Sequence, residues 1–383
     1  MKNLLKFIKK NEKKETDGEA KPQSKETRRK RIRLFYKTLL ISLSIFSSLA
    51  LSGWLAVRSL MQPPVIPEQV MASTHDMDDA VTAVATAPPE DDAEPPAEEE
   101  DEPPEPIDEN ARKENFYTFL IIGTDNGVNT DTIMIASYDA EKTKANLISI
   151  PRDTYVEADR SVKKINAAYA TGTLRGGGVE GGVAKLREEL NAIIGFVPDF
   201  YVCINLRAFR RIVDAVGGIS VYVPMRMVYD DPEQDLHINL SPGMQRLNGD
   251  NALKFSRYRM GNDQSMTITD YKRIENQQAV IRAVLAELLK PASILKIPEF
   301  IDIFIENVKT DIQMENILWF ADQFLKVKDD GNLDTYTMPT TGTSSLPFYY
   351  EYLDEAEVVK LINDTVNPFI RDIKAEDLDI KGE

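Results

Sequence analysis

The stretch FYTFLIIGTDNGVNTDTIMIASYDAEKTKANLISIPRDTYV, residues 116–156, decides the fold class of this 383-residue chain. It contains three short apolar runs that are partly β-branched, which is typical of strands. The segment AEKTKA separates the last two runs and predicts a hairpin or short turn. Because turn-forming residues also follow the first run, we expect three neighbouring strands here.

Downstream of this stretch, helical and strand patterns alternate. VAKLREELNAIIG has apolar residues at helical spacing and a closing Gly195, and FYVCINL, AFRRIVDAVGG and ISVYV predict strand, helix and strand. Further elements are expected as helices at 249–256, 270–289 and 313–327, a strand in LDTYTMP and a helix near 354–364. The order predicts an α/β domain in which a mixed central sheet is flanked by helices, an α/β/α sandwich.

The long apolar run TLLISLSIFSSLALSGWLAV, residues 38–57, carries no charge and predicts a single transmembrane helix before that domain. KETRRKRIRLFYK precedes it, so the positive-inside rule places the N-terminus in the cytoplasm and the remaining chain outside the cell membrane. A cleaved signal peptide is the alternative. The long basic leader and the lack of an A-x-A site favour the anchor.

The charge of the chain is unevenly distributed, with a net value of -16. The acidic, Pro-paired segment around APPEDDAEPPAEEEDEPPEP cannot bury enough surface to fold, and a solvated tether is favoured over a calcium site. An acidic globular part also argues against nucleic acid as a partner. The expected organisation is a basic cytoplasmic tail (1–37), the transmembrane helix (38–57), an extracellular linker (58–113), the α/β domain (114–369) and a charged C-terminal tail (370–383).

RGGGVEGG places Gly176, Gly178 and Gly181 at the spacing of a dinucleotide-binding G-x-G-x-x-G fingerprint. That fingerprint requires a buried strand before it, and NAAYATGTLR is not strand-like. We therefore expect a flexible loop leading into a helix.

Two carboxylates lie at the turn between the first two expected strands. Asp125 and Asp131 are six residues apart, so a tight connection would bring them together. Magnesium is commonly held by one or two carboxylates and substrate phosphate oxygens. On these residues alone, ordinary turn chemistry is favoured over a metal site, because Asp, Asn, Gly and Thr dominate turns.

Several arginines recur where expected elements end. Arg152 follows the third strand, and Arg257 and Arg259 alternate as on one face of an extended segment. Asp270, Arg273 and Gln277 share one face of the following helix. Guanidinium groups that converge from different elements would bind a diphosphate, although exposed salt bridges are the alternative.

The segments FLIIGTDN, TDTIMIASYD, ANLISIPRDTYV, KINAAYA, SRYR and DYKRIENQQ follow one another in an order and spacing that resembles the LytR-CpsA-Psr family. The resemblance covers about residues 116–290 and extends more weakly toward residue 366. IPRDTYV, KINAAYA and SRYR together are its specific parts.

This resemblance implies an extracellular phosphotransferase that moves a glycopolymer, such as a teichoic acid or capsule, from a polyprenyl diphosphate carrier to peptidoglycan. Asp125 and Asp131 would then bind magnesium, Asp125, Arg152 and Asp270 would be catalytic, and Arg152 would also contact the diphosphate. The remaining substrate-binding positions would be Arg257, Arg259, Arg273 and Gln277. Asp153, Lys164, Asn166 and Tyr169 would shape the site.

The chain departs from the family pattern at Gly127, Asn129 and Asn276, where arginines are common. These losses support a second hypothesis, a non-catalytic surface protein that binds polyprenyl phosphate or wall polymer. Direct transcriptional control ranks last, because no folded reader of bases is present in the tail. VIRAVLAELL, residues 280–289, could line a lipid groove with the strands that it faces, although such stripes are usually core.

Overall fold

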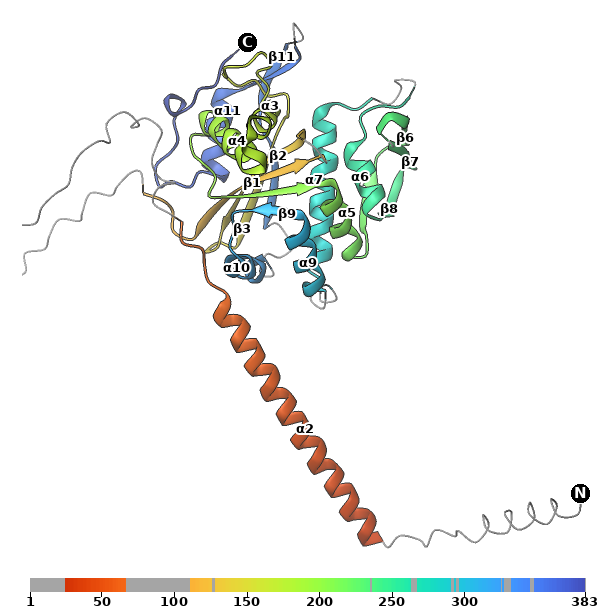
Figure 1. The fold of residues 1–383 in the computed structure, drawn as a ribbon. Helices are drawn as coiled ribbons and strands as arrows, with labels where there is room; N and C mark the ends of the chain where they lie inside the picture. The colour runs from red at the N-terminus through yellow and green to blue at the C-terminus, as the bar shows by residue number, and fades with distance from the viewer. Residues whose placement is uncertain are drawn as a thin grey trace, which may run out of the picture. The chain divides into compact units, whose positions relative to one another are not determined.

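We analysed a computed structural model of the chain (Figure 1). The structure describes residues 25–66, 111–125, 128–234, 236–262, 267–290, 293, 296–324, 326, 332–344 and 348–382. Residues 1–24 of the predicted cytoplasmic tail and residues 67–110 of the predicted linker lie outside this set. The chain forms two compact units, Met1–Gln62 and Pro63–Glu383.

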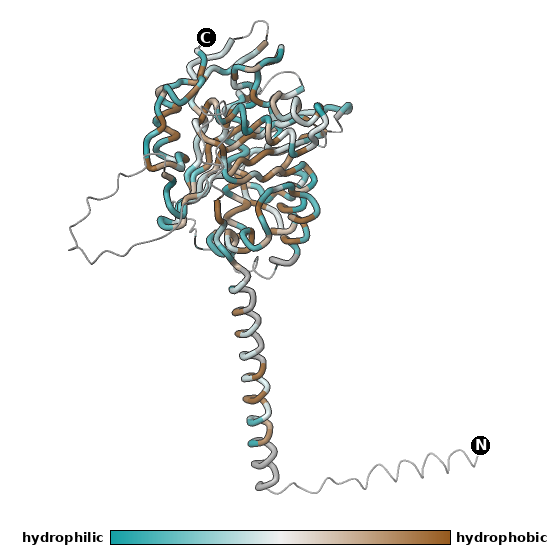
Figure 2. Tube along the Cα trace, turned by 60° about the vertical axis from the view of Figure 1, so that its left-hand side comes forward, coloured by the Kyte–Doolittle hydropathy of each residue, from teal (hydrophilic) through white to brown (hydrophobic). Residues whose placement is uncertain are grey.

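In the described part of the first unit, helix α2 runs from Lys25 to Leu60. Its 36 residues correspond to about 54 Å of helix at 1.5 Å per residue. Figure 2 shows hydrophobic segments that recur along it. Among the described residues, we find no helix with both the length and the apolar character of a membrane span.

The second unit is built on a mixed six-stranded sheet of order β10-β3-β2-β1-β4-β9. β1, β2 and β3 are antiparallel neighbours, and β4 and β10 add in parallel on either side. The strands are β1 (Phe116–Thr124), β2 (Thr130–Asp139), β3 (Lys144–Ile150), β4 (Phe200–Asn205), β9 (Val308–Thr310) and β10 (Leu333–Thr337). The predicted mixed α/β fold is therefore confirmed, as is the hairpin between β2 and β3.

One face of this sheet is covered by α3 (Asn166–Gly172), α4 (Gly178–Ile194) and α11 (Glu355–Thr365), as Figure 1 shows. Alternate residues of β1 and β2 point to this side, because side chains alternate across a strand. Leu120, Ile122, Ile133 and Ile135 are fully buried there against helix residues such as Leu186. This face therefore forms the main hydrophobic core.

The opposite face of the sheet meets a second group of elements. Its helices are α5 (Leu206–Ala215), α6 (Gly249–Arg257), α7 (Asp270–Leu288), α9 (Ile297–Asn307) and α10 (Met314–Phe324). Two antiparallel pairs accompany them: β5 (Ile219–Val223) with β8 (Gly243–Leu247), and β6 (Met227–Asp231) with β7 (Leu236–Leu240). Phe255, Tyr258 and Val280 lie in the separate core that these elements form. A last hairpin pairs β11 (Thr340–Ser344) with β12 (Tyr350–Leu353).

The glycine-rich segment is helical, so the prediction of a flexible loop there is wrong. Residues 173–177 continue α3 as a π-helical turn, and Gly176 at φ 95° kinks the chain into α4. A Cβ on Gly172 would lie 2.1 Å from the carbonyl oxygen of Gly181. These glycines thus allow two helices to pack closely, which accounts for them without a dinucleotide.

The globular unit extends past both predicted boundaries. Ile373 in the predicted C-terminal tail is 1% exposed and belongs to the main core. Ile66, in the predicted linker, packs beside Tyr117 and Phe200. Arg112 lies just before the predicted start at residue 114, and its guanidinium bonds the Asp199 carboxylate at 2.7 Å. Tertiary packing, which composition does not reveal, extends the unit at each end.

We expect Arg112→Ala to lower the free energy of unfolding by about 3–5 kcal/mol, because it leaves the Asp199 carboxylate charged and buried. That carboxylate, 1% exposed, also accepts from the backbone and hydroxyl of Thr118 at 2.8 Å. Denaturant unfolding would measure the change. The matched control is Lys142→Ala, whose exposed ion pair with Asp139 contributes about 0–1 kcal/mol. Equal losses in the two variants would contradict the prediction.

Candidate functional site

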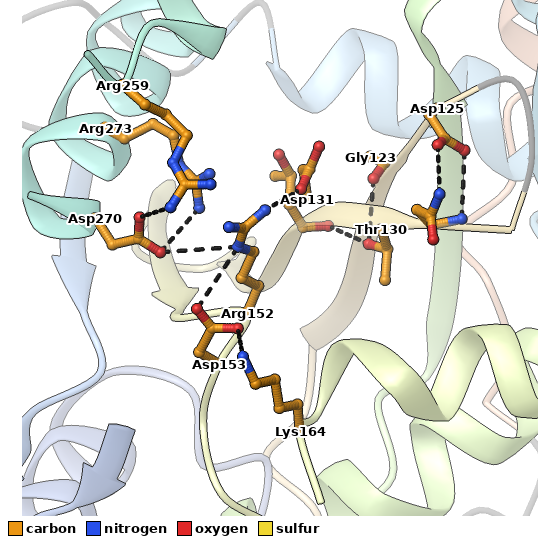
Figure 3. A network of polar contacts seen from close by, with 12 residues as sticks. Gly123, Asp125, Thr130, Asp131, Arg152, Asp153, Lys164, Arg259, Asp270 and Arg273 are labelled. Carbon is orange, nitrogen blue, oxygen red and sulfur yellow. Dashed lines mark hydrogen bonds and ion pairs between the residues drawn. The ribbon is translucent and has the colours of Figure 1, made fainter. Parts of the chain in front are cut away.

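Arg152 lies at the centre of a polar cluster on the loop after β3 (Figure 3). Its Nη1 donates to Oδ1 of Asp131 at 2.7 Å. Its Nε lies 3.8 Å from Oδ2 of Asp153 and 3.8 Å from Oδ2 of Asp270. One guanidinium group therefore faces carboxylates from β2, from its own loop and from α7.

Asp270 is the first residue of α7, where Thr269 caps the helix by accepting from the Lys272 backbone N–H. Its carboxylate bonds Arg273 at 3.1 Å and lies 3.6 Å from Nη2 of Arg259. Arg152, Arg259 and Arg273 thus converge on one carboxylate from three separate segments (Figure 3). The structure brings these predicted site residues together, and their roles stay predictions.

Arg257 ends α6, and the buried Tyr258 separates it from Arg259. Arg257 and Gln277 line a cavity together with Arg152 and Asp131. Two of the predicted arginines therefore line the cavity, and Arg259 and Arg273 meet Arg152 at the Asp270 carboxylate.

Three buried nitrogen atoms in this region have no hydrogen-bond partner among the described residues: Nε of Arg152, Nε of Arg273 and Nδ2 of Asn276. Asn276 lies one helical turn beyond Arg273 on α7, since residues three apart are neighbours on a helix. Each unsatisfied buried donor costs about 1–3 kcal/mol. An anion with several oxygens would satisfy such donors.

The cluster affects its two central arginines in opposite directions. Burial acts to lower the pKa of Arg152, but the bond to Asp131 and the charges of Asp153 and Asp270 outweigh it and raise that pKa. For Arg273, burial dominates over the attraction of Asp270 and lowers the pKa. Arg273 therefore has more to gain than Arg152 from a further negative charge.

Asp125 and Asp131 have different partners. The Asn129 side chain donates to Oδ2 of Asp125 at 2.8 Å, whereas Asp131 pairs with Arg152. In Figure 3 Thr130 lies between the two carboxylates. The described residues contain no group of three His, Cys, Asp or Glu that could hold a metal ion. Hard carboxylate oxygens nevertheless fit magnesium chemically, because this ion takes its other ligands from phosphate and water.

Beside the cluster lies an apolar cavity of about 920 Å³ between the sheet and α7. The strand residues that line it alternate with those of the main core, so one strand face packs and the other is hollow. The wall includes Ile121, Met134, Ala136, Val202, Ile281 and Leu285. The predicted groove between helix 280–289 and the facing strands is present.

Two lysines near these segments, Lys272 and Lys163, are paired with glutamates instead of the carboxylates of the cluster. Lys272 pairs with Glu275 and Lys163 with Glu157. Lys164 instead bonds Oδ1 of Asp153 at 2.8 Å and so joins the cluster (Figure 3). Its place in KINAAYA gave only a weak signal, because the contact depends on how the loop after β3 folds back.

A mixed α/β sheet with converging arginines at the mouth of an apolar cavity defines a protein suited to a ligand with an anionic head and an apolar tail. The chain belongs to the LytR_cpsA_psr family, which it matches over residues 83–366.

Curated relatives include the polyisoprenyl-teichoic acid–peptidoglycan teichoic acid transferase TagU of Oceanobacillus iheyensis, 28% identical over 258 residues, or 66% of this chain and 76% of that one. TagU of Bacillus subtilis is 26% identical over 64% of this chain and 76% of its own length. Biofilm regulatory protein A of Streptococcus mutans is 26% identical over 65% and 63%, respectively.

Two solved structures share the fold. B. subtilis TagV superposes with a TM-score of 0.54 and 24% identity, covering 66% of this chain and 96% of that one. TagT bound to LIIa-WTA gives a TM-score of 0.52 at 19% identity, covering 66% and 89%. At these identities the likeness shows the fold alone.

We expect Arg152→Ala to weaken the binding of inorganic pyrophosphate about 10- to 100-fold, the equivalent of one charged hydrogen bond worth roughly 1.5–3 kcal/mol. Isothermal calorimetry would measure it. Arg246→Ala is the control, because Arg246 pairs with Glu287 away from the cluster. Unchanged affinity in Arg152→Ala would show that the cluster is structural.

Proposed function

We propose that this protein is a phosphotransferase that attaches a polyprenyl-diphosphate-linked glycopolymer to peptidoglycan. One observation carries the proposal: the Arg152 guanidinium, which has an unsatisfied buried Nε, lines a large apolar cavity and meets Arg259 and Arg273 at Asp270. The relatives named as teichoic acid transferases support the same reaction class.

The two halves of the site match the two halves of such a donor. The cavity would take the polyprenyl chain, since its wall is formed by aliphatic and aromatic side chains. Arg152 and Arg257 line both the cavity and the polar mouth, so they would hold the diphosphate where the lipid ends. Arg259 and Arg273 would add positive charge near the diphosphate, and Gln277 would line the same opening.

The charges of the site also favour a cation alongside the diphosphate. Arg152, Arg257, Arg259, Arg273 and Lys164 face the carboxylates of Asp125, Asp131, Asp153 and Asp270. These carboxylates offset most of the positive charge, so the cations of the site do not by themselves neutralise a diphosphate. Asp125 and Asp131 would therefore hold magnesium, which supplies charge neutralisation at the phosphate oxygens.

Phosphoryl transfer depends mainly on positioning and electrostatic stabilisation. The arginines hold the phosphorus next to the sugar, and an acceptor hydroxyl of peptidoglycan attacks it. The polyprenyl phosphate leaves toward the cavity. Asp270 keeps Arg152, Arg259 and Arg273 in place and thus acts through them.

The proposed setting is the outer face of the cell membrane, with residues 38–57 as a single-pass anchor. The support is the uncharged sequence and the continuous helix α2 around it. Thr38, Ser44 and Ser48 donate their hydroxyls to backbone carbonyls three residues earlier, which removes the cost of burying these groups in lipid.

We expect the full-length chain to remain in the membrane pellet after alkaline carbonate extraction. This treatment removes peripherally bound proteins, whereas a chain held by an apolar membrane-spanning helix stays in the bilayer. Protease added to intact cells should digest the C-terminal unit. Recovery of the intact chain in the carbonate supernatant would contradict the anchor.

A non-catalytic polyprenyl-phosphate or wall-polymer binding protein is the second candidate function. Asn129 and Asn276 favour it, since both replace arginines that the family commonly has, and Gly127, outside the described residues, is a third such position. Fewer cations lower transition-state stabilisation while leaving the cavity unchanged.

The decisive assay incubates the full-length protein in detergent with a polyprenyl-diphosphate saccharide, peptidoglycan oligomers and magnesium, with mass spectrometry of the linked product. We expect product formation that Arg257→Ala lowers at least about 10-fold and that a chelator abolishes. Ala136→Phe fills the cavity and should prevent lipid binding while pyrophosphate binding persists. Lipid that binds without reacting, while a relative with all arginines reacts, would support the binding protein instead.

A further inference from the structure

The hairpin of β11 and β12 is fixed directly to the loop that carries Arg152. The Glu351 N–H donates to the carbonyl of Asp153 at 3.0 Å, and the Tyr155 N–H donates to the carbonyl of Glu351 at 2.9 Å. Glu351 is far from Asp153 in the sequence, yet their backbones are hydrogen-bonded. Asp153 directly follows Arg152, so the hairpin lies beside the Arg152 loop. The hairpin is thus a wall of the cluster.

Side chains on the two faces of β12 have different neighbours. Tyr350 and Tyr352 both stack on Tyr155, with ring centroids 5.3 Å apart in each pair. Glu351 points to the other face, because successive side chains alternate along a strand, and the Tyr349 hydroxyl, just before β12, bonds its carboxylate. On that face, Lys164 lies 6.0 Å from the centre of the Tyr349 ring while it bonds Asp153. Tyr349 and Glu351 therefore face the arginine cluster.

A chain of hydroxyl groups ends on the Glu351 carboxylate. The Tyr349 hydroxyl donates to Oε1 at 2.6 Å, and the Thr340 hydroxyl reaches Oε2 at 3.4 Å. Tyr271, next to Asp270 on α7, bonds the Thr340 hydroxyl in turn. Glu351 is 3% exposed and Tyr349 is 42% exposed, so the tyrosine connects a buried carboxylate to the surface of the site.

The charged surroundings favour uptake of a proton by Glu351. Burial raises the pKa of Glu351, the bonds from Tyr349 and Thr340 oppose this, and the charges of Asp270 and Asp153 raise it further. The groups that face it are Asp153 and Lys164 beside the Arg152 loop, Asp270 and Tyr271 on α7, and Tyr349 just before β12.

The position of this pair agrees with the direction of attack. In an in-line displacement the attacking and leaving oxygens lie on opposite sides of phosphorus. The polyprenyl phosphate would leave toward the cavity, and neither Tyr349 nor Glu351 lines that cavity. The incoming hydroxyl must approach from the other side of Arg152, where the hairpin lies.

We propose that Tyr349 binds the hydroxyl of the acceptor sugar and relays its proton to Glu351. This inference rests on the proposed function. The acceptor O–H proton passes to Oη of Tyr349 as the Tyr349 proton passes to Oε1 of Glu351. The acceptor oxygen bonds the phosphorus next to the donor sugar, and the bond from that phosphorus to the bridging oxygen breaks. The polyprenyl phosphate leaves toward the cavity as its anion, and Glu351 later releases the proton to solvent through Tyr349.

The test compares Tyr349→Phe with Tyr352→Phe in the full-length protein, since each removes one hydroxyl, from just before β12 and from within it. We expect Tyr349→Phe and Glu351→Gln to lower the transfer rate about 100-fold or more, and Tyr352→Phe to change it less than about twofold. Pyrophosphate affinity should be the same in all variants. The wild-type rate should fall at acidic pH as Glu351 is protonated, and the residual rate of Glu351→Gln should lack this dependence.

A second measurement separates this inference from the function on which it rests. Saturation-transfer NMR with soluble peptidoglycan oligomers should detect binding in the wild type and in Tyr352→Ala, and loss of binding in Tyr349→Ala. If the wild type transfers no polymer but shows this pattern, the transferase proposal fails and the acceptor site stands. If transfer occurs at the wild-type rate in Tyr349→Phe, or oligomers bind Tyr349→Ala normally, the relay is wrong.

Discussion

The arginine cluster depends on the ion pairs that the Asp270 carboxylate makes with its neighbouring guanidinium groups. Three guanidinium groups, from Arg152, Arg259 and Arg273, would repel one another at this separation without a shared counter-charge. Thr269 fixes Asp270 by capping α7, and α7 is in turn packed beside the sheet. Local helix capping, tertiary packing and the geometry of the anion site are therefore one connected arrangement.

The sequence predicted the parts of the fold that local patterns encode. β1, β2 and β3 were visible as apolar runs, and the i, i+3, i+7 spacing of Asp270, Arg273 and Gln277 correctly placed them on one helix. The convergence of Arg152 with that helix could only be hypothesised, since no spacing rule joins residues 118 positions apart. The prediction that Arg152 lies in the same site as α7 came from the family resemblance.

Features that depend on distant packing were not predictable in the same way. Tyr349 and Glu351 sit in a short hairpin with no motif, and their position follows from backbone bonds to the Arg152 loop. The glycine-rich segment resembled a loop because glycine is common in loops, yet its glycines serve close contact between α3 and α4. Ile373 was assigned to a charged tail because its neighbours are charged, and it is buried in the core. In each case the position of the residue depends on tertiary packing, which local composition does not reveal.

The substituted arginine position at Asn129 changes the electrostatics of the site in a defined direction. Asn129 satisfies Asp125 with neutral N–H groups, from its side chain at 2.8 Å and from its backbone at 3.3 Å. A neutral donor orients a carboxylate without cancelling its charge, whereas an arginine would do both. Asp125 therefore retains more of its attraction for a cation than it would beside a guanidinium group. In the proposed transferase, fewer fixed arginines would leave more of the diphosphate charge to be balanced by a bound magnesium ion.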